Sequence, residues 1–259
     1  MLNALHKGLR RLSRHARMPS ACRWCGTWQA QGVCHDCLHA FSQTGSRCLR
    51  CGLRLSADSL ERICSSCLDY PPELDNVVVG VDFVPPWSEM VSALKFRADL
   101  AAAQVLADKL SQAVLATLDS TVLPYPDLIV PIPLSVSRWH ERGYNQAWLL
   151  AQRVATNLGW KNRLHHATLI RNGDTGRLMQ MKRDEREARI RGAFSVDSAQ
   201  AHRVRGQHVV LVDDVMTTGA TANAAARALY RAGAASVTGW FATRTPAPRQ
   251  SIQSIRAAQ

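Results

Sequence analysis

The sequence predicts an α/β protein: a mainly parallel β-sheet with helices on both faces, preceded by a small cysteine-rich module. Short apolar runs alternate with amphipathic helical patterns, as buried parallel strands alternate with their crossover helices. All eight cysteines lie between Cys22 and Cys67, before these runs. The 259 residues suffice for one such domain and a small module. We expect four segments: a basic tail (1–20), a cysteine module (21–70), an α/β domain (71–245) and a disordered tail (246–259).

The tail from Met1 to Met18 is basic and weakly amphipathic, because leucines recur on one helical face among lysines and arginines. It lacks the apolar segment and the cleavage site of a secretory signal. A solvated tail is the simpler interpretation, and a helix that binds a membrane surface or nucleic acid is the alternative. No run approaches the roughly 18 consecutive apolar residues of a membrane-spanning helix. The net charge of +12 is compatible with phosphorylated ligands or nucleic acid as partners.

The cysteines form four C-x-x-C pairs, of which the first and third are followed by glycine and the other two by leucine. Glycine tolerates the positive φ of a metal-binding knuckle. The repeat predicts two structural zinc sites, filled in sequence as a double zinc ribbon: Cys22, Cys25, Cys34 and Cys37, then Cys48, Cys51, Cys64 and Cys67. A cross-braced pairing of alternate knuckles remains open. Disulfides are the competing interpretation, but a reducing cytoplasmic location fits a chain that is otherwise free of cysteine.

The cysteine module has fewer than fifty residues between Cys22 and Tyr70, too few for a large apolar core. Zinc would supply the missing folding free energy. The module also contains arginines and the tryptophans Trp24 and Trp28, a mixture that can stack on single-stranded nucleic acid. Packing around the knuckles explains the tryptophans equally well.

The α/β domain begins after Tyr70, where two prolines end the cysteine module. Its first half is expected to contain a strand (76–84), two helices (87–95, 99–118), a strand (127–133), a basic turn (138–146) and a helix that ends at Leu158. Asp99 can cap the second helix, and Gly159 can end the third. The second half is expected to contain a strand (164–170), a polar basic segment (171–192), a buried strand (209–212), a helix (222–232) and a last strand (236–243).

The stretch from Val209 to Thr221, V-V-L-V-D-D-V-M-T-T-G-A-T, organises this domain. Its strand ends in Asp213 and Asp214, which can accept hydrogen bonds from vicinal hydroxyls or hold a hydrated Mg²⁺. A small-residue turn then leads into a helix, where N–H groups and hydroxyls can bind a phosphate and Gly219 allows close approach. The stretch therefore predicts a sugar phosphate as the ligand. A purely structural strand, turn and helix is the alternative.

This stretch resembles the thirteen-residue phosphoribosyl diphosphate (PRPP) motif of type I phosphoribosyltransferases. The resemblance implies the type I phosphoribosyltransferase fold and the binding of PRPP with Mg²⁺. It also implies that the two acids hold the ribose hydroxyls and that a five-residue loop binds the 5′-phosphate: Asp213 and Asp214, then Thr217, Thr218, Gly219, Ala220 and Thr221.

Two further elements, Arg142-Gly143-Tyr144-Asn145-Gln146 and Leu94-Lys95-Phe96, narrow the resemblance to the ComF family, which joins a cysteine ribbon to a phosphoribosyltransferase domain. The resemblance implies that Arg138 and Arg142 face the diphosphate, a role that suits guanidinium geometry. It also implies a mobile loop within 171–192 that closes over PRPP. In this loop the chain has Leu178 where a glutamine is usual and Arg189 where an asparagine is usual. These departures weaken the expectation of catalysis, and no catalytic residue is assigned.

Two functions are compatible with these patterns. One is a PRPP-binding phosphoribosyltransferase-like protein that transfers the phosphoribosyl group to a nitrogenous acceptor. The other is a DNA-uptake factor that binds single-stranded DNA, with PRPP as a ligand and little or no turnover, because ComF relatives are associated with natural transformation. The sequence does not specify the acceptor or the oligomeric state.

Overall fold

The computed structural model describes residues 20–29, 32–42, 45–56, 59, 61–120, 123–173 and 192–247. Most of the two predicted tails and most of the polar segment 171–192, with Leu178 and Arg189, lie outside the described residues. The chain divides into two compact units, residues 1–42 and 43–259. The first cysteine cluster belongs to the smaller unit and the second to the larger one.

The smaller unit contains an antiparallel pair of short strands, β1 (Ser20–Ala21) and β2 (Trp28–Gln29), and the helix α2 (His35–Phe41). The sulfur of Cys34 caps this helix by accepting a hydrogen bond from the amide of Cys37. The ring of Trp24 packs edge-to-face on Phe41, with 5.3 Å between the ring centroids. Trp28, in contrast, is 74% exposed, so packing within the unit accounts for only one of the two tryptophans.

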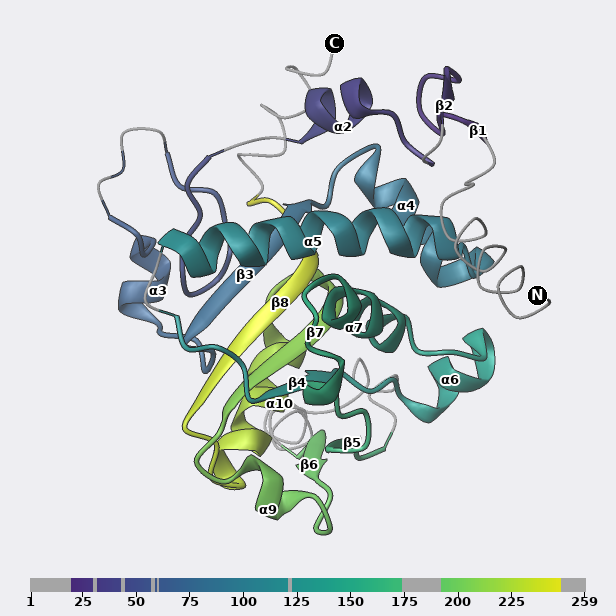
Figure 1. The fold of residues 1–259 in the computed structure, drawn as a ribbon. Coiled ribbons are helices and arrows are strands. Elements are labelled where there is room, and N and C mark those ends of the chain that lie inside the picture. The colour runs from purple at the N-terminus through teal and green to yellow at the C-terminus, as the bar shows by residue number, and fades with distance from the viewer. Residues whose placement is uncertain are drawn as a thin grey trace, which may run out of the picture. The chain divides into compact units, whose positions relative to one another are not determined.

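The larger unit is built on a four-stranded parallel sheet in the order β3-β8-β7-β4 (Figure 1). The strands are β3 (Asn76–Asp82), β4 (Leu128–Pro131), β7 (His208–Met216) and β8 (Ser236–Arg244). The two central strands are buried over most of their length, as strands covered on both faces must be. The register sets Asp213 beside Phe241 and Met216 beside Arg244, so the paired acids lie near the carboxyl end of the sheet. The predicted α/β fold with a parallel sheet is confirmed.

Helices cover both faces of this sheet (Figure 1). On one face α5 (Leu100–Ser120) and α7 (Gln146–Asn157) pack side by side, and α4 (Trp87–Arg97) packs against α5. On the other face α10 (Ala220–Arg231) buries its alanines against β7 and β8. Asp99 caps α5 as expected, because its carboxylate accepts a hydrogen bond from the amide of Ala102 at 2.9 Å. None of the helices in the described ranges is long and apolar enough to cross a membrane.

Two sequence-based expectations are corrected in the connections between these elements. The expected basic turn at 138–146 is mostly the helix α6 (Val136–Arg142), which Ser135 caps and Gly143 ends with φ +74°. The expected strand at 164–170 is limited to β5 (Leu169–Arg171), which pairs with β6 (Phe194–Val196) outside the main sheet. The remaining short helices are α3 (Ser65–Asp69), the 3₁₀ turn η1 (Lys161–Arg163) and α9 (Ala201–Val204).

Candidate functional site

The junction between β7 and α10 has the geometry of an anion-binding turn. Gly219 immediately precedes α10 with φ +83°, a conformation that favours glycine. A Cβ atom at Gly219 would also lie 2.9 Å from Cε of Met216, so a larger residue would not fit without a shift. Gly219 has no side chain with which to cap this helix N-terminus, and only the amide of Ala220 donates to a neighbouring side chain, that of Thr218, among the described residues. The N–H groups that follow Ala220 in the first turn of α10 can therefore donate to an anion.

A cavity of about 410 Å³ lies at this junction, and we call it the phosphate cavity. It is lined by most of the predicted site residues: Arg138, Asp213, Asp214, Thr217, Gly219, Ala220 and Thr221. Of the other two predicted residues, Thr218 accepts a hydrogen bond at Oγ1 from the amide of Ala220, at 3.4 Å. The guanidinium of Arg142 lies over the ring of Phe96, 5.4 Å from its centroid. Nε and Nη1 of Arg142 have no hydrogen-bond partner among the described residues, so its role toward a diphosphate stays a prediction.

The two carboxyl groups of the cavity differ in their partners. Asp214 is buried, and its carboxylate lies 2.7 Å from Nζ of Lys95 at the end of α4. Burial raises the pKa of the Asp213 carboxyl well above its usual value, the charge of Asp214 raises it further, and Lys95 opposes the rise. Asp213 therefore takes up a proton more readily than an exposed aspartate. Lys95 belongs to the Leu94-Lys95-Phe96 element, but the sequence analysis did not assign it to the site.

The R-G-Y-N-Q segment connects the walls of the cavity. The hydroxyl of Tyr144 donates a hydrogen bond to the carbonyl of Leu94, next to Lys95. The amide of Asn145 donates to the carbonyl of Ile132 at 3.1 Å, and its oxygen accepts from the amide of Ala147 at 2.9 Å. These bonds tie α4, the loop after β4 and the start of α7 together, which gives both sequence elements a structural role.

Gln146, the last residue of that segment, is a further member of the cavity. Its side chain is 3% exposed, and its Oε1 atom has no hydrogen-bond partner among the described residues. An unpaired buried amide oxygen costs about 1–3 kcal/mol unless a ligand satisfies it. Arg171 at the end of β5 also lines the cavity. The position of Gln146 in the signature could have identified it, whereas Arg171 follows only from the fold.

The eight cysteines form two clusters in sequence order, Cys22/25/34/37 and Cys48/51/64/67, and within each cluster all Sγ atoms lie within 4.8 Å of one another. The sulfurs of Cys25 and Cys34 are 3.6 Å apart, and those of Cys51 and Cys64 are 3.7 Å apart. Four thiolates at the Zn–S distance of about 2.3 Å in a tetrahedron have edges of about 3.8 Å. The clusters therefore fit zinc, and the cross-braced pairing does not occur.

The clusters repeat one another in their hydrogen bonds. The amide of Cys34 donates to Sγ of Cys22, and that of Cys64 donates to Sγ of Cys48, both at 3.3 Å. Burial would raise the pKa of Cys22, but hydrogen bonds from backbone amides outweigh burial and lower it to about 6. The same balance lowers the pKa of Cys48 to about 7. Each cluster thus contains at least one thiol that readily becomes a thiolate ligand.

The second cluster is fixed to the sheet. The amide of Val77 in β3 donates to the carbonyl of Leu49 at 2.6 Å, and Arg47 forms an ion pair with the buried Asp82 at 2.7 Å. Gly52 has φ +70°, and a Cβ atom there would lie 2.5 Å from Cγ2 of Val79. The glycine after the third C-x-x-C pair therefore permits both the knuckle and its close contact with the sheet.

Comparisons with known proteins agree with this architecture. Residues 147–249 match the model of the phosphoribosyl transferase domain. The crystal structure of TT1426 from Thermus thermophilus is 20% identical in sequence, and the match covers 61% of this chain and 78% of the TT1426 chain. Its TM-score of 0.30 is too low to support a conclusion.

Curated relatives align along nearly their whole length. The DNA utilization protein YhgH of Salmonella typhi is 39% identical over 218 residues, 83% of this chain and 91% of the relative. The competence protein ComFC of Bacillus subtilis is 30% identical over 238 residues, 85% of this chain and 90% of the relative. Competence protein F of Haemophilus influenzae is 29% identical over 213 residues, which are 82% of this chain and 90% of the relative. A phosphoribosyltransferase domain, two four-cysteine clusters and these full-length relatives show that the chain belongs to the ComF family.

Proposed function

We propose that the phosphate cavity binds PRPP together with Mg²⁺. The observation that carries the proposal is the joint presence, in one cavity, of paired carboxyl groups and a helix N-terminus whose N-cap residue, Gly219, has no capping side chain. The loop at 217–221 binds the 5′-phosphate through backbone N–H groups and hydroxyls. Asp213 and Asp214 accept hydrogen bonds from the ribose hydroxyls. Bound Mg²⁺ would neutralise part of the diphosphate charge.

Cations in and beside the cavity support the same ligand. Arg138, Arg171 and Lys95 line it, and Lys95 also forms an ion pair with Asp214. Arginine suits a diphosphate because its planar fork can donate two parallel hydrogen bonds to phosphate oxygens. We assign Arg138 to the diphosphate and keep Arg142 as a second candidate, because two of its nitrogens have no partner among the described residues.

If the bound PRPP reacts, a nitrogen of the acceptor attacks C1 of the ribose. The C1–N bond forms, the C1–O bond to the diphosphate breaks, pyrophosphate leaves with the electron pair, and the nitrogen loses its proton to water. Orientation and stabilisation of charge are the contributions that this cavity can make, since no nucleophilic side chain is needed. The acceptor is a nitrogenous base in this proposal.

The second candidate function is the binding of single-stranded DNA, with PRPP as a ligand that is not turned over. It is favoured by the names of the relatives, which refer to DNA utilization and competence, and by the net charge of +12. Both candidates imply a cytoplasmic protein, since the cysteine clusters require reduced thiols to hold zinc.

The test is a calorimetric titration of the full chain with PRPP and Mg²⁺. The double variant Asp213→Asn, Asp214→Asn is expected to abolish measurable binding, whereas Asp119→Asn, an exposed position on α5, is the matched control and is expected to bind normally. Unchanged affinity in the double variant would overturn the site. Release of pyrophosphate from PRPP only when a nitrogenous base is added supports transfer. Binding without release, together with salt-dependent DNA binding, supports the second candidate.

A further inference from the structure

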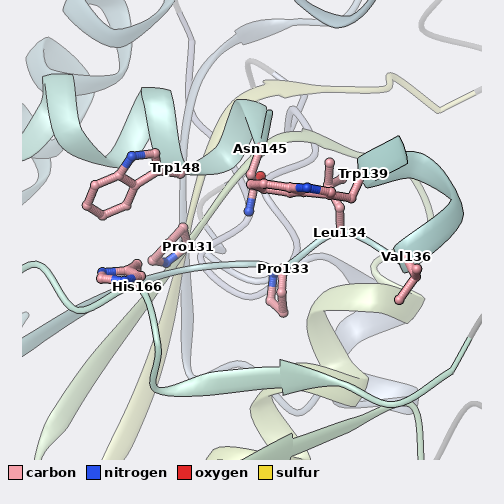
Figure 2. Close-up of a pocket in the computed structure, with 8 residues that line it drawn as sticks. All are labelled: Pro131, Pro133, Leu134, Val136, Trp139, Asn145, Trp148 and His166. Atoms are coloured by element: carbon pink, nitrogen blue, oxygen red, sulfur yellow. The ribbon is translucent and has the colours of Figure 1, made fainter. Parts of the chain in front are cut away.

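A second cavity, of about 480 Å³, lies behind the loop that follows β4, and we call it the aromatic cavity (Figure 2). Trp139 from α6 stands at one side of it, and Trp148 from α7 and His166 stand at the other, with Pro131 and Pro133 between them. Its lining is completed by Leu134, Val136 and Asn145. This cavity plays no part in the proposed binding of PRPP.

The geometry of the aromatic side chains leaves flat faces available to a ligand. The rings of Trp148 and His166 meet edge-to-face, with 5.2 Å between centroids and an interplanar angle of 64°. Trp139 is 52% exposed although it lines a cavity. The amide of Asn145 makes one hydrogen bond as donor and one as acceptor, so it keeps one of each for a ligand. Flat apolar faces beside a neutral donor and acceptor suit a nucleobase.

The aromatic cavity is adjacent to two others, with which it shares lining residues. It shares Pro133 and Leu134 with the phosphate cavity, and it shares Trp148 with a cavity of about 450 Å³ that we call the basic cavity. The basic cavity is lined by Gln104, Trp148, Gln152, Arg153, Thr156, Asn157, Lys161 and Leu164. The three cavities are therefore neighbours in a series, with the aromatic cavity in the middle.

The charges in this series favour a polyanion. Within the described part of the chain, no carboxylate lines the aromatic or the basic cavity, and the basic cavity holds Arg153 and Lys161. Arg153 donates a hydrogen bond to Oε1 of the neutral Gln104, whose amide donates in turn to the carboxylate of Asp108 at 2.6 Å, so this acid lies one side chain behind the lining of the basic cavity. The phosphate cavity, the other neighbour of the aromatic cavity, is lined by Arg138, which directly precedes Trp139 in the chain. Cations thus flank the aromatic side chains on both sides.

We propose that the aromatic cavity takes an unpaired base of single-stranded DNA, stacked on Trp139 or Trp148, with the backbone phosphates beside Arg138 and beside Arg153 and Lys161. A positive track interrupted by aromatic faces is how proteins bind single strands without reading sequence. Duplex DNA does not fit, because its bases are stacked inside the helix and must be flipped out to enter a pocket. This inference rests on the proposed binding of single-stranded DNA and specifies where the DNA binds.

The experiment is a fluorescence-anisotropy titration of the full chain with labelled oligothymidine and with an abasic oligonucleotide of the same length. Stacking is worth about 1–3 kcal/mol per base, so Trp139→Ala and Trp148→Ala are each expected to weaken oligothymidine binding about 5- to 150-fold. The abasic strand is expected to bind the wild type more weakly, and the alanine variants are expected to lose this difference between the strands. Trp139→Phe and Trp148→Phe keep an aromatic face and are expected to bind within about threefold of the wild type.

Two controls separate stacking from folding and from charge. Tyr125→Ala removes a 62% exposed aromatic ring outside the three cavities and is expected to bind as the wild type does. PRPP binding, measured in every variant, reports whether the domain is folded. Arg153→Gln with Lys161→Gln is expected to flatten the salt dependence of the affinity and to weaken the thymidine and abasic strands equally.

The outcomes distinguish the inference from the function on which it rests. If the wild type binds no single-stranded DNA, that function is wrong and the inference falls with it. If the wild type binds but the alanine variants bind equally well with PRPP binding intact, the function stands and the aromatic cavity is not its site. Full competition by free thymidine would instead assign the cavity to a free base. Dissociation of a dimer in the tryptophan variants would assign it to a second copy of the chain. Either result would overturn the proposal.

Discussion

Arg244, at the end of β8, donates a hydrogen bond from Nε to the carbonyl of Cys51 at 2.7 Å. Its Nη1 also donates to the carbonyl of Met216 at 3.0 Å and to that of Thr217. The side chain is buried at 6% exposure. Because Cys51 belongs to the second cysteine cluster and Thr217 lines the phosphate cavity, one buried guanidinium connects the two sites.

Arg244→Met is expected to destabilise the larger unit and to weaken PRPP binding. The substitution keeps an unbranched apolar stem but removes the guanidinium donor from the carbonyls of Cys51 and Thr217, at about 1–3 kcal/mol for each group, whereas the carbonyl of Met216 still accepts from the amide of Thr245. We expect a loss of at least about 3 kcal/mol in the free energy of unfolding by urea. PRPP affinity is expected to fall about tenfold, since the displaced carbonyls begin the loop that holds the phosphate.

The matched control for this variant is Arg227→Met. Arg227 pairs with Glu73 at 3.1 Å, with both side chains partly exposed, and such pairs contribute less than about 1 kcal/mol. Equal unfolding free energies for the two variants would show that the buried bonds of Arg244 add nothing to stability.

The two cysteine clusters are expected to differ in their effect on PRPP binding. Cys64→Ser and Cys34→Ser remove equivalent ligands, because each residue donates its amide to the sulfur of the first cysteine in its cluster. Each variant is expected to lose one of the two zinc ions, measured by atomic emission. Only Cys64→Ser is expected to lower the melting temperature of the larger unit and the PRPP affinity, because that cluster is bonded to the sheet. Equal loss of PRPP affinity in both variants would contradict this coupling.

The affinity for PRPP is expected to fall at acidic pH, beginning above the usual titration range of aspartate. Burial, reinforced by the charge of Asp214, raises the pKa of Asp213. A protonated carboxyl group accepts fewer hydrogen bonds from ribose hydroxyls. The phosphates of PRPP titrate as well, so the measurement is the difference between the wild type and Asp213→Asn. The wild type is expected to show the steeper pH dependence in calorimetric titrations.

The raised pKa of Asp213 also makes the stability of the ligand-free protein depend on pH, in the direction opposite to that of the PRPP affinity. A carboxyl group whose pKa is higher in the folded state stabilises folding below its unfolded pKa and loses that contribution as the pH rises through the folded value. Asp213→Asn is therefore expected to make the ligand-free protein more stable than the wild type at pH 8, with the advantage shrinking as the pH is lowered. Thermal melts at several pH values check this, and an advantage that grows toward low pH would show that the pKa is lowered instead.

Local patterns in the sequence were sufficient to predict the main strands of the sheet and the turn at Gly219 that leads into α10. The apolar run before Asp213, the small residues around Gly219 and the capping carboxylate of Asp99 each act over a few residues, so each could be predicted without the fold. The prediction of a basic turn at 138–146 was wrong for its first five residues, which belong to α6. Ser135 and Gly143, which cap and end α6, were the signals that indicated a helix.

Contacts between distant segments could not be predicted in the same way. Lys95 reaches Asp214 from a helix more than a hundred residues away in the chain, and Arg244 reaches Cys51 across an even longer interval. The sequence patterns place Trp139 on a basic segment and Trp148 on a helix, and only the fold brings both to one cavity with His166. Long-range placement depends on sheet order and helix packing, which a pattern along one segment does not contain.

Gln146 offers the most direct test of whether the phosphate cavity is built for a ligand. Its Oε1 atom is buried without a partner among the described residues, so replacement by an apolar side chain of similar length removes an unsatisfied acceptor. Gln146→Met is expected to raise the stability of the ligand-free protein by about 1 kcal/mol in urea unfolding. The same variant is expected to bind PRPP about 5- to 30-fold more weakly, because a hydroxyl or phosphate-bound water then loses its acceptor. Gln152→Met on the outer face of α7 is the control and is expected to change neither quantity. A gain in stability with unchanged PRPP affinity would mean that Gln146 binds no ligand. A gain in stability together with weaker PRPP binding is the result expected of a functional site, because such sites often reduce stability in favour of binding.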